Sequence, residues 1–281
     1  MQSLVLKFCC ENQPGIVAAV SKFVFETGGD ITEAAQFDDR TTGKFFMRMV
    51  FSTAAPPEEV KRQLARLTTR FGAECEIRQA GRKRKVLIMV SKFDHCLGDL
   101  LYRMRIGELN MDCVGVVSNH PQEKLTSRSH IGLPYHYLPV NADTKAEQEG
   151  AIKHIVEDTG AELIVLARYM QILSDDFAHY LSGRCINIHH SFLPGFKGAK
   201  PYHQAHIRGV KMIGATAHYV TGDLDEGPII AQDVEQVSHS DTPDDMVRKG
   251  RDIERRVLAR AVLLYLEDRI FVNENKTVVF A

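Results

Sequence analysis

Residues 186–195 read Ile-Asn-Ile-His-His-Ser-Phe-Leu-Pro-Gly, and residues 214–228 read Gly-Ala-Thr-Ala-His-Tyr-Val-Thr-Gly-Asp-Leu-Asp-Glu-Gly-Pro. Apolar and polar residues alternate at the start of the first stretch, which predicts a strand that sends Asn187 and His189 to the same side. The second stretch carries Asp225 in a glycine-rich turn. We therefore expect an amide, an imidazole and a carboxylate to converge on one reacting atom. The alternative is an amide and an imidazole that are hydrogen-bonded inside a polar strand end.

Working outward, strand and helix patterns alternate from residue 86 onward, as a doubly wound, mostly parallel α/β sheet requires. The last helix is the clearest, because Thr242 can cap it and Pro243 suits its first position. Ligands of open sheets bind beyond the carboxyl ends of the strands, where Asn187 and His189 would lie. The expected strands cover 86–90, 112–117, 135–138, 162–166, 185–189, 213–221 and 228–237, and the expected helices lie near 95–106, 144–158, 174–181, 201–208 and 243–268.

The first 80 residues show a different order: strand, helix, strand, strand, helix, strand. This order predicts a ferredoxin-like βαββαβ domain. A polar, basic run then predicts a linker at 81–85, so the expected domains are 1–80 and 86–281. A nucleic-acid patch is the alternative interpretation of this run, but no aromatic residues are interleaved with its charges.

One strand of the N-terminal domain alternates strongly, with Phe45, Met47, Met49 and Phe51 on one face. These side chains supply more apolar area than so small a domain is expected to bury alone. We therefore predict symmetric pairing of this domain, which would make a homodimer or a homotetramer.

Composition narrows the class of protein. The chain has 281 residues, 44% of them hydrophobic, which is enough for a well-buried core. A net charge of −1 gives no reason to expect nucleic acid as a partner. Six cysteines without a Cys-x-x-Cys pair argue against a zinc ribbon or a redox dithiol. No run approaches the roughly 20 apolar residues of a membrane span, so we expect a cytoplasmic protein with no membrane partner.

Taken together, the motif Asn187-x-His189, the residues 191–194, His218 and the turn at 223–228 resemble the signature of the folate-dependent formyltransferase superfamily. The resemblance covers roughly residues 84–281. It implies 10-formyltetrahydrofolate as the formyl donor and Asn187, His189 and Asp225 as the catalytic residues. A tetrahedral intermediate would then be stabilised by the first two, with Asp225 as the base. No metal or cofactor is expected.

The resemblance also locates a folate pocket. Residues 168–173 follow an expected strand and are similar to the segment that holds the pterin ring in that superfamily. A plain strand-to-helix connection with apolar anchors is the alternative. The residues expected to bind substrate are Tyr169, Met170, Gln171, Ile172, Leu173, His218, Thr221 and Leu224.

Two histidine pairs suggest zinc at first sight. His189 and His190 are adjacent on an expected strand, and we expect them to point to opposite faces. His203 and His206 lie three apart in an expected helix, but the sequence offers no third ligand. Neither pair predicts a metal site.

The resemblance implies the formyl donor but leaves the acceptor of the formyl group open. A phosphorylated acceptor such as glycinamide ribonucleotide calls for a glycine-rich loop after the first strand of the domain. Residues 91–97 are bulky there and include Asp94. Water is therefore the expected acceptor, with formate and tetrahydrofolate as products. Transfer to a small amine and a non-catalytic folate-sensing module remain the alternatives.

The N-terminal domain resembles an ACT domain, a small effector-sensing module, through residues 12–17 and 29–31. The resemblance implies an amino-acid effector held by the loop that contains Asn12, Gln13, Gly15 and Ile16. A purely structural role in subunit association is the alternative.

Overall fold

The computed structural model describes residues 1–193 and 201–281, and these residues divide into two compact units. The first unit contains Met1–Arg82 together with Glu267–Phe271 and Val278–Ala281, and the second contains Lys83–Leu266 and Val272–Thr277. Residues near the end of the chain therefore belong to the N-terminal unit, which sequence periodicity did not indicate. Pro194 of the sequence motif lies outside the described residues.

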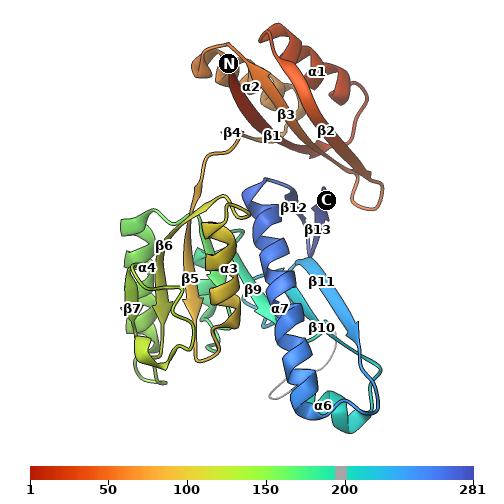
Figure 1. The fold of residues 1–281 in the computed structure, drawn as a ribbon. Coiled ribbons are helices and arrows are strands. Elements are labelled where there is room, and N and C mark those ends of the chain that lie inside the picture. The colour runs from red at the N-terminus through yellow and green to blue at the C-terminus, as the bar shows by residue number, and fades with distance from the viewer. Residues whose placement is uncertain (194–200) are drawn as a thin grey trace. The chain divides into compact units, whose positions relative to one another are not determined.

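The first unit has the expected order of elements (Figure 1). Its sheet has the strand order β2-β3-β1-β4, and all of its neighbouring strands are antiparallel. This confirms the ferredoxin-like βαββαβ fold. The elements are β1 (Gln2–Glu11), α1 (Ile16–Glu26), β2 (Asp30–Asp39), β3 (Lys44–Thr53), α2 (Pro57–Phe71) and β4 (Glu74–Gln79).

The apolar face of β3 is the centre of this unit's core. Phe45, Met47, Met49 and Phe51 are all buried, and they form one cluster with apolar residues of α1 and α2. The expectation that these four side chains form an exposed pairing surface is wrong, because the two helices cover that face of the sheet. The oligomeric state stays a prediction, without this support.

The second unit is built on a seven-stranded, mostly parallel sheet with the order β11-β10-β9-β8-β5-β6-β7. Only the pairs β9–β10 and β10–β11 are antiparallel. The strands are β5 (Arg84–Val90), β6 (Met111–Ser118), β7 (Tyr135–Tyr137), β8 (Leu163–Leu166), β9 (Cys185–His189), β10 (Met212–Tyr219) and β11 (Ile229–Gln236), and a two-stranded sheet of β12 (Ile270–Asn273) and β13 (Lys276–Val279) follows.

Helices cover both faces of this sheet, as the doubly wound pattern predicts (Figure 1). The helices α4 and α5 share one apolar cluster with β5 and β8, whereas α3 packs against α7, which also contacts β9, β10 and β11. The helices are α3 (His95–Arg105), α4 (Lys145–Thr159), α5 (Asp175–Tyr180), α6 (Pro201–Arg208) and α7 (Pro243–Leu266), with a 3₁₀ turn η1 (Gln122–Lys124).

The start of β5 differs from the expected linker, whereas the start of α7 agrees with the sequence. Strand β5 begins at Arg84, so the last two residues of the linker expected at 81–85 are strand residues. Helix α7 begins as expected, with Thr242 and Asp245 bonded to each other's backbone N–H groups. This reciprocal capping satisfies donors that the first helical turn leaves free.

The strand order explains where a site can form. β5 lies between β6 and β8, so the chain leaves β5 in one direction and later returns on its other side. Such a reversal opens a crevice beyond the carboxyl ends of the strands. Chain segments that follow β5, β8 and β9 meet there. Among the helices of residues 1–193 and 201–281, none combines the length and the apolar character needed to cross a bilayer.

Candidate active site

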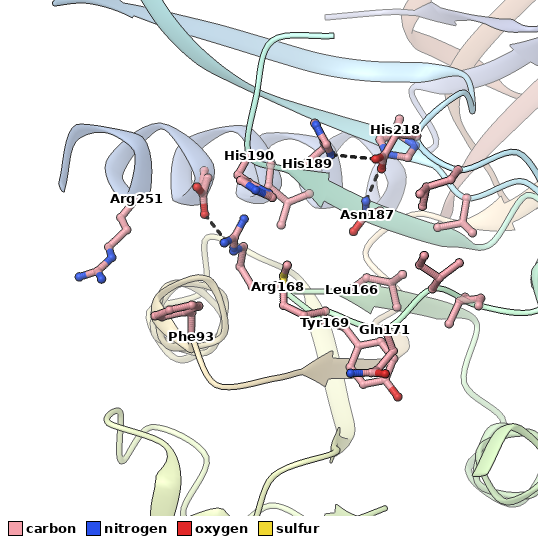
Figure 2. Close-up of a pocket in the computed structure, with 18 of the residues that line it drawn as sticks. Phe93, Leu166, Arg168, Tyr169, Gln171, Asn187, His189, His190, His218 and Arg251 are labelled. Atoms are coloured by element: carbon pink, nitrogen blue, oxygen red, sulfur yellow. Dashed lines mark hydrogen bonds and ion pairs between the residues drawn. The ribbon is translucent and has the colours of Figure 1, made fainter. Parts of the chain in front are cut away.

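A cavity of about 720 Å³ lies beyond the carboxyl ends of β5, β8 and β9 (Figure 2). Segments that follow these strands line it, together with the end of β10, the turn after it, α6 and α7. Every residue of this unit that the sequence singled out for catalysis or substrate binding lines the cavity: Asn187, His189, Asp225, Tyr169, Met170, Gln171, Ile172, Leu173, His218, Thr221 and Leu224.

Asn187 and His218 are brought together by the antiparallel register of β9 and β10, which pairs these two residues directly. The Asn187 Nδ2 atom lies 3.2 Å from His218 Nε2, and His218 Nδ1 lies 2.8 Å from the Tyr219 carbonyl oxygen. A carbonyl only accepts, so the His218 proton belongs on Nδ1, and Nε2 is left to accept from Asn187. This contact fixes the orientation of the Asn187 amide.

His189 and Asp225 form the charged part of the site. The His189 Nδ1 atom lies 3.2 Å from Asp225 Oδ2, and His218 Nε2 lies 3.6 Å from Asp225 Oδ1. Burial by itself raises the pKa of the Asp225 carboxyl, but the hydrogen bond from His189 and the charge of its ring outweigh it and hold the pKa well below its ordinary value. His189 Nε2 is buried and has no hydrogen-bond partner among the residues that the structure describes.

A strained turn carries Asp225 into the site. The backbone of Asp225 has a φ of 60°, which is in the left-handed region. Two residues later, a Cβ atom at Gly227 would lie 1.8 Å from the Tyr219 carbonyl oxygen, so only glycine fits. The Thr221 hydroxyl closes the turn by donating to the Asp223 carbonyl oxygen. The sequence Asp-Leu-Asp-Glu-Gly-Pro is thus a geometric requirement as well as a motif.

The segment after β8 forms an apolar wall. Met170 and Ile172 are more than half exposed and line the cavity. Tyr169 is buried, its hydroxyl donates to Gln148 Oε1 at 3.1 Å, and burial raises its pKa to about 12. The Met170 N–H donates to Ser91 Oγ at 2.9 Å, which ties the segment to the end of β5. A fixed backbone with exposed apolar side chains suits a flat aromatic ligand.

The expectation that His189 and His190 point to opposite faces is wrong. Their ring centroids lie 5.2 Å apart, and both residues line the cavity. Strand β9 ends at His189, so the alternation of a strand no longer applies to His190. Burial and the nearby charge of Arg168 lower the pKa of His190 to about 4, so this imidazole is neutral at pH 7.

The sequence reasoning missed a buried polar cluster at the other side of the cavity. Glu254 of α7 is 1% exposed, and its carboxylate lies 2.8 Å from His95 Nε2 and accepts from the Tyr202 hydroxyl at 2.7 Å. Arg168 Nε lies 3.4 Å from the same carboxylate. In the sequence, the only indication of this cluster is a single glutamate beside the apolar stripe of the last helix, and that indication is weak. We call these four residues the Glu254 cluster.

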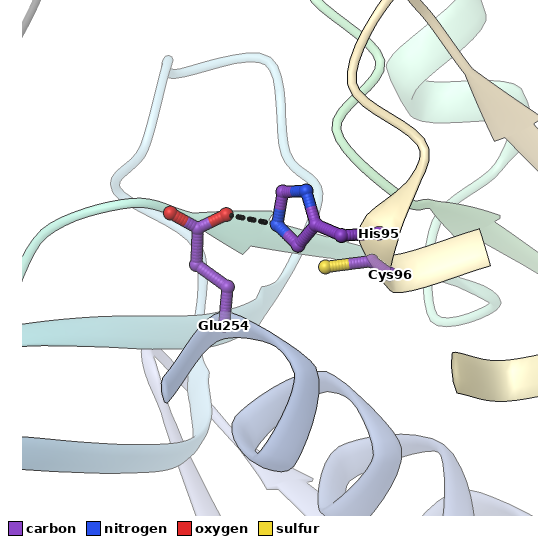
Figure 3. Close-up of side chains that lie close together, drawn as sticks. All are labelled: His95, Cys96 and Glu254. Atoms are coloured by element: carbon purple, nitrogen blue, oxygen red, sulfur yellow. Dashed lines mark hydrogen bonds and ion pairs between the residues drawn. The ribbon is translucent and has the colours of Figure 1, made fainter. Parts of the chain in front are cut away.

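Two members of this cluster resemble a metal site together with Cys96, because ligand atoms of His95, Cys96 and Glu254 lie within 4.8 Å of one another (Figure 3). Its chemistry argues against a metal. The carboxylate of Glu254 is already engaged by three side chains. We therefore interpret His95 and Glu254 as members of a hydrogen-bonded network.

The remaining candidates lie apart from this chemistry. His203 and His206 are both exposed on α6, and His203 alone lines the cavity. In the first unit, Asn12, Gln13 and Gly15 of the expected effector loop are exposed. The Ile16 side chain is buried in the apolar core, so it is unavailable to an effector.

Known proteins resemble the chain over its whole length. The Formyl transferase family model matches residues 84–262, and the ACT domain model matches residues 4–69. Formyltetrahydrofolate deformylase of Corynebacterium sp. (strain P-1) is 48% identical, with 98% of this chain and 97% of the relative covered. The chain belongs to the formyltetrahydrofolate deformylase family. This confirms the folate-dependent formyltransferase resemblance and the ACT resemblance seen in the sequence.

Solved structures agree with membership of the formyltetrahydrofolate deformylase family. The crystal structure of formyltetrahydrofolate deformylase from Burkholderia mallei is 50% identical, covers 100% of both chains and has a TM-score of 0.95. Glycinamide ribonucleotide transformylase 1 from Symbiobacterium toebii is similar over 72% of this chain and 97% of its own, at 27% identity and a TM-score of 0.66. Hydrolysis and transfer therefore both occur on this scaffold, and the acceptor has to be argued from the site.

Proposed function

We propose that this enzyme hydrolyses 10-formyltetrahydrofolate to formate and tetrahydrofolate, with water as the formyl acceptor. The observation that carries this proposal is the convergence of Asn187, His189 and Asp225 at a cavity whose adjoining wall is apolar. Binding a folate does not need an amide donor, an imidazole and an ionised carboxylate at one cavity. Attack of water on a formyl group does need such a set, because charge develops on the carbonyl oxygen and water loses a proton.

The reaction is a displacement at the formyl carbon. Water oxygen bonds to that carbon, the carbonyl becomes a tetrahedral oxyanion, and the Asn187 amide and the His189 imidazolium donate to it. The proton that water loses goes to the Asp225 carboxylate, which lies 3.2 Å from Nδ1 of the charged His189. Cleavage of the bond to N10 then releases formate, and Asp225 returns a proton to N10 of tetrahydrofolate.

The low pKa of Asp225 has a definite part in this mechanism. A carboxylate that is ionised next to Nδ1 of His189 before water attacks stabilises the positive charge on the ring. The buried Nε2 atom of His189 then has a proton to donate, and the oxyanion supplies the partner that it otherwise lacks. Because His218 is held by the Tyr219 carbonyl oxygen, it fixes Asn187 and leaves the second amide hydrogen for substrate.

Water as acceptor is supported at the start of α3. Asp94 precedes this helix, and its carboxylate accepts from the Ser127 backbone N–H at 2.5 Å. A phosphate needs free backbone N–H groups and no competing anion at such a helix start. The buried charge of Asp94 opposes a phosphorylated acceptor there.

We also propose that no added cofactor is needed, and that the ACT unit senses an amino acid through Asn12, Gln13 and Gly15. The exposure of this loop supports the second proposal. Neither claim alters the chemistry at Asn187.

The experiment is turnover of 10-formyltetrahydrofolate by the purified full chain in the presence of a metal chelator. Formate and tetrahydrofolate are measured with no acceptor added, and again with glycinamide ribonucleotide. We expect the two products in equal amounts and no effect of the nucleotide. Formyl transfer to glycinamide ribonucleotide that is faster than formate release would contradict the proposal.

A further inference from the structure

Arg168 occupies a position that is unusual for an arginine. Its backbone has a φ of 67°, a conformation that glycine adopts at much lower cost. It stands directly before Tyr169, and its carbonyl oxygen accepts from the Ser91 N–H at 3.2 Å. The left-handed conformation costs about 1–2 kcal/mol for such a residue. A side chain retained under this strain is expected to do something that glycine cannot.

The Arg168 side chain is 10% exposed and is directed away from the apolar wall (Figure 2). Its guanidinium carbon lies 6.0 Å from the centroid of the Phe93 ring, and that of Arg251 lies 5.9 Å from the same centroid. In Figure 2, Tyr169 and Gln171 lie on the opposite side of Arg168 from Phe93. The cavity therefore has an apolar side, formed by the residues that follow Arg168 in the chain, and a charged side, which the Arg168 side chain lines.

The charged side is held in place by residues from four separate segments. Besides Arg168, the Glu254 cluster uses His95 from the start of α3, Tyr202 from α6 and Glu254 from α7. A Cβ atom at Gly250 would lie 2.1 Å from the Tyr202 ring, so glycine at this position lets the ring reach Glu254. Burial acts to raise the pKa of the Glu254 carboxyl, but the hydrogen bond from His95 and the charge of Arg168 hold it below its ordinary value.

The Glu254 cluster also adjoins the proposed catalytic residues. The Tyr202 ring lies 6.4 Å from the His190 ring, which is 5.2 Å from the His189 ring, and all three residues line the same cavity. An amine that attacks the formyl carbon must come within about 3–3.5 Å of it, on a side that the folate leaves open. If the folate lies against the apolar wall, as the proposed function requires, the side that it leaves open is the charged side, which Arg168 and Glu254 line.

We propose that Arg168, paired with Glu254, determines the acceptor of the reaction by closing the charged side of the cavity to primary amines. This inference rests on the hydrolysis proposed above. Displacing Arg168 would remove the arginine partner of the buried Glu254 carboxylate, which is costly for a buried charge. Water needs no displacement. Arg168 is thus a residue that sets specificity, and it does not touch the reacting atoms.

The test replaces Arg168 by glycine, the residue that fits a φ of 67°, in the full chain. Glycinamide is the probe, because it is a primary amine without a phosphate. In transfer, its nitrogen bonds to the formyl carbon, the bond from that carbon to N10 breaks, and the amine proton passes to N10. Formate and N-formylglycinamide are measured together. We expect the ratio of N-formylglycinamide to formate to rise about tenfold or more in Arg168→Gly relative to the unaltered enzyme.

Two further variants keep the test decisive. Glu274→Gly is the matched control, because Glu274 also has a positive φ, of 56°, and does not line the cavity. Its product ratio should equal that of the unaltered enzyme. The double variant Arg168→Gly/Glu254→Gln removes both buried charges, so it provides a folded protein if the single variant does not fold.

The outcomes separate this inference from the proposed function. Absence of formate release by the unaltered enzyme would refute the proposed function. Normal formate release by that enzyme, with an unchanged product ratio in the folded variants, would overturn the role of Arg168. Loss of hydrolysis in a folded variant without any gain of N-formylglycinamide would overturn it as well, because Arg168 would then act in the chemistry.

Discussion

The two units differ in how their buried polar groups are paired. In the first unit, Thr53 donates to the Thr27 carbonyl oxygen and Asp268 accepts from Arg78. Nη1 of Arg48 in the first unit lacks a hydrogen bond but forms an ion pair with Glu33 at 2.8 Å. In the second unit, Nε2 of His189, a residue that lines the cavity, is buried without a hydrogen-bond partner among the described residues. Each such atom costs about 1–3 kcal/mol. An apolar core with paired polar groups indicates a scaffold, whereas unpaired groups that line a cavity indicate a place where a substrate or a transition state completes the pairing.

The largest effect on turnover is expected when the Asp225 carboxylate is replaced by an amide. Asp225→Asn keeps the size of the side chain but cannot support a charged His189 or accept a proton. We expect kcat to fall by about 10³–10⁴-fold with little change in the KM for 10-formyltetrahydrofolate. Steady-state kinetics at saturating substrate measures this loss.

Asp268→Asn is the matched control, since Asp268 is 4% exposed and pairs with Arg78 in the first unit. We expect it to lower the free energy of unfolding by about 3 kcal/mol, measured in urea, while turnover per folded molecule stays unchanged. Nearly normal turnover in Asp225→Asn would contradict the distinction between a catalytic carboxylate in the second unit and a structural one in the first.

The next largest effect on kcat is expected at Asn187, the neutral donor to the oxyanion. Asn187→Ala removes one hydrogen bond to the oxyanion, so we expect kcat to fall by about 10²–10³-fold at an unchanged KM. Asn141→Ala is the control, because Asn141 is exposed and bonds only within its own loop, to the N–H groups of Asp143 and Thr144 and the Thr144 hydroxyl. A raised KM with normal kcat in Asn187→Ala would assign Asn187 to folate binding and exclude it from stabilising the oxyanion.

The smallest effect is a pH dependence of stability. Folded His190 has a pKa of about 4, whereas the unfolded chain binds this proton near pH 6.5. Between these values the unfolded state holds more protons, so the free energy of unfolding decreases as the pH falls from 6.5 to 4, by at most about 3 kcal/mol. Urea denaturation at several pH values should show a shallower slope for His190→Gln. The exposed His239→Gln should keep the slope of the unaltered protein, and equal slopes in all three proteins would contradict the burial argument.

Much of the fold and of the site followed from local patterns. The alternation around Asn187 and His189, the glycine-rich turn at Asp225 and the order of strands and helices are all periodic or conformational signals, which neighbouring residues carry. Because a strand alternates with a period of two, two side chains on one face could be assigned without knowing what faces them. The same rule failed at His190, where the strand ends.

Only the tertiary structure decided which distant residues meet. Arg168, Tyr202 and Glu254 lie on segments separated by 34 and 52 residues, and no local period relates them. The same holds for Glu267–Phe271, which belongs to the first unit although nearly 200 residues separate it from the end of that domain. Side-chain periodicity reports which face of an element is buried, but it does not report what covers that face. The sequence thus determined the scaffold and its reacting groups, and the packing of remote segments decided the shape and charge of the space around them.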